Sequence, residues 1–178
     1  MGLKAGHTAF KVKVGRGAKW MERKAGDQRD IEVIKAIRAH GDKDLIIGID
    51  ANNGYDLAGT KRLFEEIGEL DIAFAEEMFP ETVEHCLTFK AFIRENKWKT
   101  LVADGETQGN LQVFKPFIEA QAIEVYQADM KRFGFETALE ENLAMGLGAS
   151  ALTMRELARA YTVFPTLGDR REPYFISE

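Results

Sequence analysis

The 178-residue chain alternates short apolar runs with longer amphipathic stretches, and this alternation limits its possible folds more than any other feature. The runs, rich in Val, Ile, Phe and Ala, are 8–14, 44–50, 72–76, 100–104 and 122–128. Short apolar runs that alternate with helix-length segments are typical of βα units. Because crossovers between parallel strands are right-handed, we expect five neighbouring strands that all point the same way.

The segments between the runs have the periodicity of helices. Their apolar residues recur every three or four positions, as in Ile31, Ile34 and Ile37, then Leu63, Phe64 and Ile67, then Cys86, Phe89 and Ile93. We expect two further helices at 110–120 and 135–147. The first helix is expected to begin near Gln28, where Asp27 and Asp30 would lie near the positive end of its dipole.

Chain length is compatible with one domain over residues 1–178, because a chain of this size buries one sizeable core. Two closures of a parallel sheet remain open. Five units fit an open, doubly wound sheet, whereas a complete (β/α)₈ barrel takes about 250 residues. The periodicity alone favours neither closure.

Composition argues against several classes of protein. The 24 Lys and Arg and the 29 Asp and Glu give a formal charge of -5 without a basic block, so we expect no nucleic-acid partner. Cys86 is the single cysteine, which excludes an internal disulfide and is typical of a reducing, cytoplasmic location. No apolar stretch approaches the roughly 18 residues of a membrane helix, so we expect a soluble protein without membrane contact.

Ionisable side chains accompany every expected strand. They are Lys11 and Lys13 in the first strand, Asp50 and Glu76 at the ends of the second and third, and Glu106 and Asp129 after the fourth and fifth. The carboxyl ends of parallel strands form the ligand-binding edge in both closures. Three carboxylates meeting there make a hard oxygen site suited to Mg²⁺. We assign Asp50, Glu76 and Glu106 to that site.

Each of these residues also has a simpler interpretation when taken alone. Alternating lysines fit an edge strand that faces water, and Asp50 before Ala-Asn-Asn-Gly fits a turn or a helix cap. Glu76 and Glu106 could be solvated, and Asp129 could pair with a nearby cation at the surface. Such interpretations must hold independently at five strands, whereas one shared site explains all of them.

Five short motifs occur in the order of a known family. They are the Lys-x-Lys of Lys11 and Lys13, the Asp-x-Asn of Asp50 and Asn52, the Glu-Glu of Glu76 and Glu77, the Gly-Glu of Gly105 and Glu106, and the Gln-x-Asp of Gln127 and Asp129. The pattern resembles the barrel domain of the enolase superfamily, in its mandelate racemase and muconate lactonizing branch. The resemblance covers about residues 6–136 and implies a partial TIM-like (β/α) barrel.

The resemblance also implies a chemistry. Lys13 would remove a proton alpha to a substrate carboxylate, and Lys11 would lower the pKa of that base. The three carboxylates would hold Mg²⁺, a combination that occurs throughout this superfamily. Asn52 would support the metal shell, and Asp129 would orient a catalytic His on the next strand. The expected reaction is dehydration of an acid sugar by a lyase, or racemisation or epimerisation by an isomerase.

The chain departs from the family pattern after Asp129. Its three histidines, His7, His40 and His85, all come earlier, so the Asp and His pair is not completed. We also expect the family's first barrel strand and amino-terminal capping domain to be missing. A truncated barrel exposes strand edges, which favours assembly into a homo-oligomer.

Two alternatives to an enzyme remain. The first is a truncated, catalytically inactive barrel fragment that binds metal or assembles with itself. The second is an open-sheet domain with an acidic pocket, similar to a response regulator, although such a pocket does not require the Lys-x-Lys motif.

Overall fold

The computed structural model describes residues 2–15, 20–41, 43–106 and 111–127. Contacts between residues divide the chain into two compact units. The first contains Met1–Asp104 and Gln121–Tyr126, and the second contains Gly105–Ala120 and Gln127–Glu178. The helix expected at 135–147 lies outside the described residues, and a single domain over 1–178 stays a prediction.

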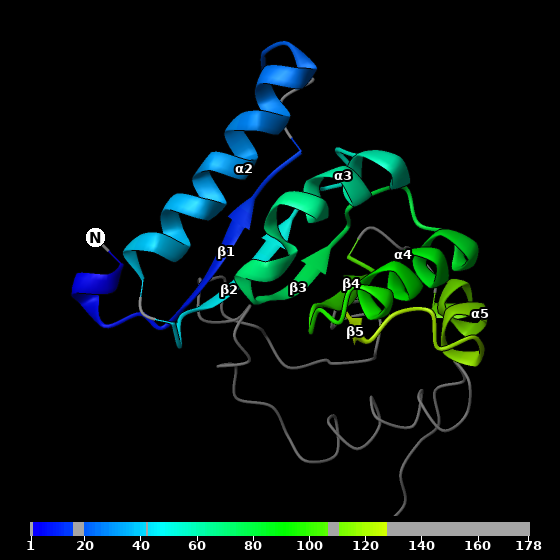
Figure 1. The fold of residues 1–178 in the computed structure, drawn as a ribbon. Coiled ribbons are helices and arrows are strands. Elements are labelled where there is room, and N and C mark those ends of the chain that lie inside the picture. Colours follow the sequence, from blue (N-terminus) through cyan, green and yellow to red (C-terminus); the bar gives the residue numbers. More distant parts are fainter. Residues whose placement is uncertain (1, 16–19, 42, 107–110, 128–178) are drawn as a thin grey trace, which may run out of the picture. The chain divides into compact units, whose positions relative to one another are not determined.

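The first unit contains a parallel five-stranded sheet in the order β1-β2-β3-β4-β5 (Figure 1). The strands are β1 Ala9–Lys13, β2 Ile46–Asp50, β3 Ile72–Glu76, β4 Leu101–Asp104 and β5 Val125–Tyr126. Each one falls within an apolar run of the sequence, so the five expected strands are confirmed. Their sequential order follows from right-handed βα crossovers.

Three long helices connect the strands of the first unit. They are α2 Arg23–His40, α3 Leu57–Ile67 and α4 Val83–Glu95, with the short 3-10 helices η1 Leu3–Ala5 and η2 Gly68–Leu70. Figure 1 shows α2, α3 and α4 along one face of the sheet, and neighbouring helices contact each other. In the second unit, the helix expected at 110–120 is divided into η3 Leu111–Val113 and α5 Phe114–Glu119. No described helix is long and apolar enough to cross a membrane.

The expected start of the first helix was wrong. Helix α2 begins at Arg23, because the side chain of Glu22 accepts a hydrogen bond from the backbone N–H of Ala25 at 3.0 Å and caps the first turn. Asp30 therefore lies in the interior of the helix and is only 4% exposed. A carboxylate at such a place needs partners, since burial without hydrogen bonds is unfavourable.

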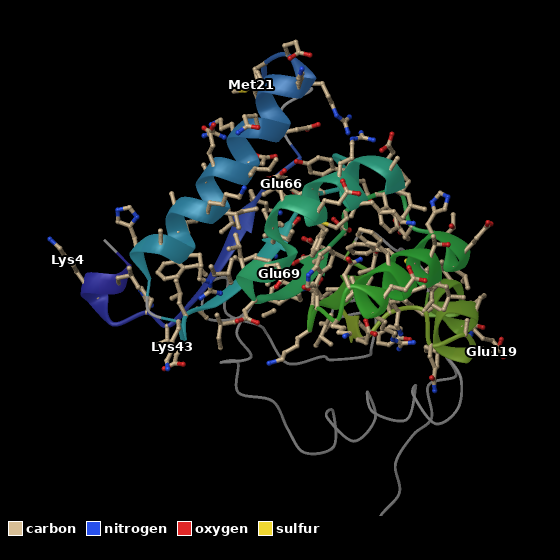
Figure 2. All side chains as sticks on the ribbon, viewed as in Figure 1. Lys4, Met21, Lys43, Glu66, Glu69 and Glu119 are labelled. Carbon is tan, nitrogen blue, oxygen red and sulfur yellow. The ribbon has the colours of Figure 1, made fainter. Side chains whose placement is uncertain are left out.

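The hydrophobic core lies between the sheet and the helices. Ile49 of β2, Ile34 of α2, Phe64 of α3 and Phe89 of α4 are fully buried, and the two phenylalanine rings meet edge to face at 5.0 Å. Burial of such a side chain contributes about 1.5–3 kcal/mol each. The outward side of the helices is polar, as at the exposed Glu66 of α3 (Figure 2). One face of the sheet therefore packs against the helices, and the other face carries the polar residues described next.

Candidate metal centre

The ends of the first three strands carry a row of charged residues. Lys13 of β1 pairs in register with Asp50 of β2, and Asp50 pairs with Glu76 of β3. Register partners in a sheet project from the same face, and the three residues are each the last of their strand. One cation and two carboxylates therefore share one edge of the sheet.

Lys11 of β1 contacts both carboxylates directly, and Lys13 contacts that of Asp50. Lys11 Nζ donates to Glu76 Oε1 at 3.0 Å and Oε2 at 2.9 Å, and lies 3.0 Å from Asp50 Oδ2. Lys13 Nζ donates to Asp50 Oδ2 and, at 2.7 Å, to Asn52 Oδ1. The alternating lysines of β1 could have belonged to an edge strand that faces water. Instead, both lysine side chains point toward the carboxylates.

Burial separates the anions from the cations of this group. Asp50 is 0% and Glu76 1% exposed, whereas the lysine side chains are 42% and 40% exposed. Burial lowers the pKa of Lys11, but its hydrogen bonds to Glu76 and Asp50 outweigh burial and raise that pKa above its ordinary value. Burial acts to raise the pKa of Asp50, and the hydrogen bonds from Lys13 and Lys11 leave it below its ordinary value. Asp50 is therefore an anion over the physiological pH range.

Asn52 connects Lys13 and Asp50 to a further buried acid, Glu77. Its Nδ2 donates to Glu77 Oε2 at 3.1 Å, and its backbone N–H donates to Asp50 Oδ1 at 3.1 Å. Asn52 and Glu77 have φ values of 43° and 42°, and Glu77 is 0% exposed. A left-handed backbone costs a residue other than glycine about 1–2 kcal/mol. The role of Glu77 was missed by sequence reasoning, although the Glu-Glu doublet was visible.

Two predicted site residues remain, Glu106 and Asp129, and only Glu106 lies within the described residues. Glu106 is exposed and belongs to the second unit, two positions after Asp104, the last residue of β4. Asp129, the expected partner of a catalytic His, lies outside the described residues. The catalytic and metal-binding roles of all these residues therefore stay predictions.

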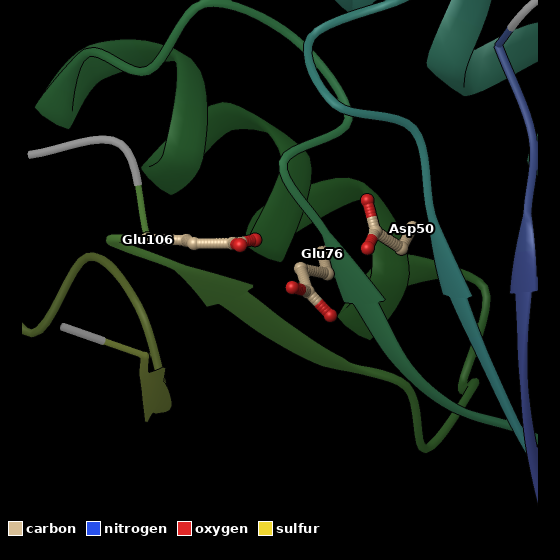
Figure 3. Close-up of side chains that lie close together, drawn as sticks. All are labelled: Asp50, Glu76 and Glu106. Atoms are coloured by element: carbon tan, nitrogen blue, oxygen red, sulfur yellow. The ribbon is translucent and has the colours of Figure 1, made fainter. Parts of the chain in front are cut away.

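The acidic residues have the chemistry of a site for a hard divalent cation. Asp50 and Glu76 each offer a carboxylate oxygen, and these two atoms lie within 4.8 Å of each other (Figure 3). Carboxylate oxygens are the ligands that Mg²⁺ prefers, and Mg²⁺ usually keeps several waters in addition. The donor set thus fits Mg²⁺ and offers neither thiolate nor imidazole.

Fold and site together define a class of protein, namely an α/β protein with an acidic group that could bind a metal at the carboxyl ends of its parallel strands. The chain belongs to the family described as Enolase C-terminal domain-like, whose model matches residues 2–148. Both the resemblance seen in the sequence motifs and the α/β fold class are confirmed.

Two curated relatives match parts of the chain, and one of them is named as an enolase superfamily member. The chain is 30% identical over 148 residues to "Mitochondrial enolase superfamily member 1" of Xenopus laevis, covering 83% of this chain and 30% of the relative. It is 37% identical over 71 residues to an L-amino acid-D/L-Glu epimerase of Francisella philomiragia, covering 40% of this chain and 17% of that protein. The chain therefore spans less than a third of the length of these relatives.

Solved structures of the mandelate racemase and muconate lactonizing type have a similar fold. A mutant galacturonate dehydratase from Geobacillus sp., complexed with Mg, has a TM-score of 0.68 and 29% identity over 72% of this chain and 33% of its own. A mandelate racemase/muconate lactonizing protein from Geobacillus sp. Y412MC10, complexed with magnesium and tartrate, has the same values. These neighbours are enolase-superfamily barrel enzymes, so the parallel sheet described here corresponds to part of such a barrel.

Proposed function

We propose that this chain supplies the metal-binding and lysine-base part of an enolase-superfamily active site, which removes the proton alpha to the carboxylate of an acid sugar. The observation that carries this proposal is the contact of Lys13 with Asp50 at the ends of adjacent strands, beside the buried Glu76. A base and two metal-binding anions within one small space are what alpha-proton abstraction requires.

Asp50, Glu76 and Glu106 would hold Mg²⁺. The first two are supported by their burial and mutual proximity, and Glu106 by its position two residues after the end of β4. Bound Mg²⁺ would supply positive charge that stabilises the negative charge developing on the substrate carboxylate. Asn52 supports the arrangement, because it donates to both Asp50 and Glu77.

Lys13 would accept the alpha proton at Nζ. Two features support this role, namely its position as the last residue of β1 and its half-exposed side chain, which a substrate can reach. Lys11 would remain protonated as the second cation, since its hydrogen bonds to Glu76 and Asp50 raise its pKa. A division between a base and a permanently protonated ammonium allows proton transfer without loss of the positive charge near the substrate.

An acid sugar is the preferred substrate class. Structures 29% identical to this chain include a galacturonate dehydratase complexed with D-galacturonate and 5-keto-4-deoxy-D-galacturonate. The epimerase relative supports a competing substrate class, namely an amino-acid derivative whose reacting carbon is alpha to a carboxylate. Dehydration requires loss of a beta hydroxyl, whereas epimerisation requires only return of the proton to the other face.

Solvent exchange of the alpha proton tests the proposal without knowledge of the final product. The full chain is incubated in D₂O with Mg²⁺ and a panel of hexuronates, aldonates and amino-acid carboxylates, and proton loss is followed by NMR. We expect exchange that depends on both Mg²⁺ and the chain. A folded sample that binds Mg²⁺ but exchanges no member of the panel would contradict catalysis.

That outcome would instead favour the second candidate, a catalytically inactive fragment that binds metal. It requires only the acidic pair of Asp50 and Glu76, whose carboxylate oxygens lie within 4.8 Å of each other, and no lysine base. We propose that the chain forms a homo-oligomer. Light scattering during size-exclusion chromatography would measure its molar mass in solution. Isothermal calorimetry with Mg²⁺ would measure the metal binding that both candidates share.

A further inference from the structure

A buried carboxylate outside the acidic group holds the chain just after the proposed base. Asp30 of α2 is 4% exposed, and its Oδ2 accepts two hydrogen bonds. One comes from the backbone N–H of Gly15 at 2.7 Å, and the other from the hydroxyl of Tyr55 at 2.8 Å. Gly15 lies two residues after Lys13, so the carboxylate of Asp30 acts on the backbone that carries the proposed base.

The turn at Gly15 has little freedom to move. Gly15 has φ of 73°, a left-handed conformation that favours glycine. It touches Gly54 backbone to backbone, because a Cβ on Gly54 would lie 2.1 Å from the carbonyl oxygen of Gly15. The preceding residue, Val14, donates its backbone N–H to the carbonyl of Asp50 at 2.9 Å. The loops after β1 and β2 are therefore joined directly.

Tyr55 extends this connection to a third loop. Its backbone N–H donates to the carbonyl of Met78, after β3, at 3.1 Å, while its hydroxyl reaches Asp30. The ring is 4% exposed and lies under the guanidinium of Arg23, 5.5 Å from the ring centroid. Burial, and then the charge of Asp30, raise the pKa of Tyr55 well above its ordinary value, so the phenol remains a donor.

We propose that Asp30 and Tyr55 are positioning residues for Lys13, which they hold in register with Asp50 through the turn at Gly15. This inference rests on the proposed function only in that Lys13 is the base. The side chains of Asp30 and Tyr55 form hydrogen bonds with Gly15 and with each other, so their effect on Lys13 passes through the backbone of Gly15. A misplacement of a reacting group by about 1 Å can cost about a hundredfold in rate.

The variant Tyr55→Phe tests the proposal, because it removes one hydroxyl and leaves the ring in place. Thr60→Val is the matched control. Thr60 is also fully buried, and its hydroxyl donates to the carbonyl of Asp56, one helical turn earlier, at 2.9 Å. The conservative variant Asp30→Asn retains one carbonyl acceptor and should give an intermediate effect.

Three measurements on the full chain test the contacts from Tyr55 and Asp30 through the Gly15 turn to Lys13. Hydrogen exchange at the Gly15 amide reports the turn, and the acetylation rate of Lys13 relative to Lys35, by peptide mass spectrometry, reports the base. The rate of alpha-proton exchange with the acid-sugar panel reports catalysis. For Tyr55→Phe we expect about tenfold faster amide exchange, at least about a threefold change in relative acetylation, and about tenfold lower kcat with KM within twofold.

The outcomes separate this inference from the proposed function. If Tyr55→Phe matches Thr60→Val in Lys13 acetylation and in kcat, the positioning role is overturned. If the unaltered chain shows no alpha-proton exchange, the proposed function fails, and the amide and acetylation measurements still decide the positioning role. If Tyr55→Phe does not fold, Asp30→Asn is judged by the same three readouts.

Discussion

Lys11 Nζ donates to both carboxylate oxygens of Glu76, at 3.0 and 2.9 Å, although β1 and β3 are not neighbours in the sheet. The side chain of Lys11 therefore crosses β2. Its register partner on β2 is Gly48, which has no side chain, and the next partner in the row is Phe74 of β3. A Cβ at Gly48 would lie 2.2 Å from the ring of Phe74. Gly48 thus leaves room for the ring of Phe74 in the row that Lys11 crosses.

Replacement of Gly48 by Ala should lower the free energy of unfolding by about 1–3 kcal/mol, because the ring of Phe74 must move. Urea denaturation measures the change. In the background Phe74→Leu the same substitution should cost less, since the branched side chain can retreat from the methyl group. Equal costs in the two backgrounds would show that the ring is not the cause.

Replacement of Lys13 by Met should reduce alpha-proton exchange by about 10²–10⁴-fold, the usual contribution of a general base. Mg²⁺ affinity should stay the same or increase, because the substitution removes a cation that contacts Asp50. Deuterium exchange and calorimetry measure the two effects. Lys35→Met is the control, since Lys35 pairs with the exposed Glu66 on the outward side of the helices. A parallel loss of metal affinity would contradict the assignment of Lys13 as base.

Replacement of Glu76 by Gln should weaken Mg²⁺ binding by more than about tenfold, because a full negative charge near the ion is lost. The measurement is the rise of the unfolding midpoint with added Mg²⁺. A ligand at 100 times its Kd stabilises the native state by about 2.7 kcal/mol, and about half of this or more should disappear in the variant. Glu66→Gln, at an exposed carboxylate, should retain the full effect. Retention by the Glu76 variant as well would remove Glu76 from the metal site.

The strands and the proximity of Asp50 to Glu76 could be predicted from the sequence because two independent signals coincide. Apolar runs mark the strands, and in a parallel sheet the polar residue that ends each run must lie at one common edge. Asp50 and Glu76 could therefore be placed together before any coordinates existed, and the structure joins them with the lysines of β1. The family followed from the order of five motifs and not from any one of them.

Asp30 shows what the sequence could not reveal. Its position before an apolar periodic stretch predicted a residue of the helix start, but a cap farther back, at Glu22, moved the start of α2. The partners of Asp30 are Gly15 and Tyr55, which lie 15 and 25 positions away along the chain. No local pattern encodes such contacts, since they depend on how the loops after β1 and β2 meet.

Cys86 provides a prediction for the dependence of stability on pH. The thiol is 0% exposed, and burial, then the charges of Asp104 and Glu81, raise its pKa to about 12 from an ordinary 9.0. Between these values the unfolded chain loses the proton that the folded chain keeps, so rising pH favours unfolding. The free energy of unfolding should fall by up to about 1.4 kcal/mol per pH unit above pH 9.

Urea denaturation between pH 9 and 10 measures this fall against the variant Cys86→Ala. The range stops at pH 10 because Tyr55 and Tyr126 also have raised pKa values and begin to titrate in the unfolded chain there. The variant is expected to be less stable at every pH, since it leaves a small cavity, but its stability should depend less steeply on pH. The same thiol should resist alkylation in the native state, because only the thiolate reacts. If the stability of the two proteins falls equally steeply with pH, Cys86 ionises equally easily in the folded and unfolded chains. That result would contradict the prediction.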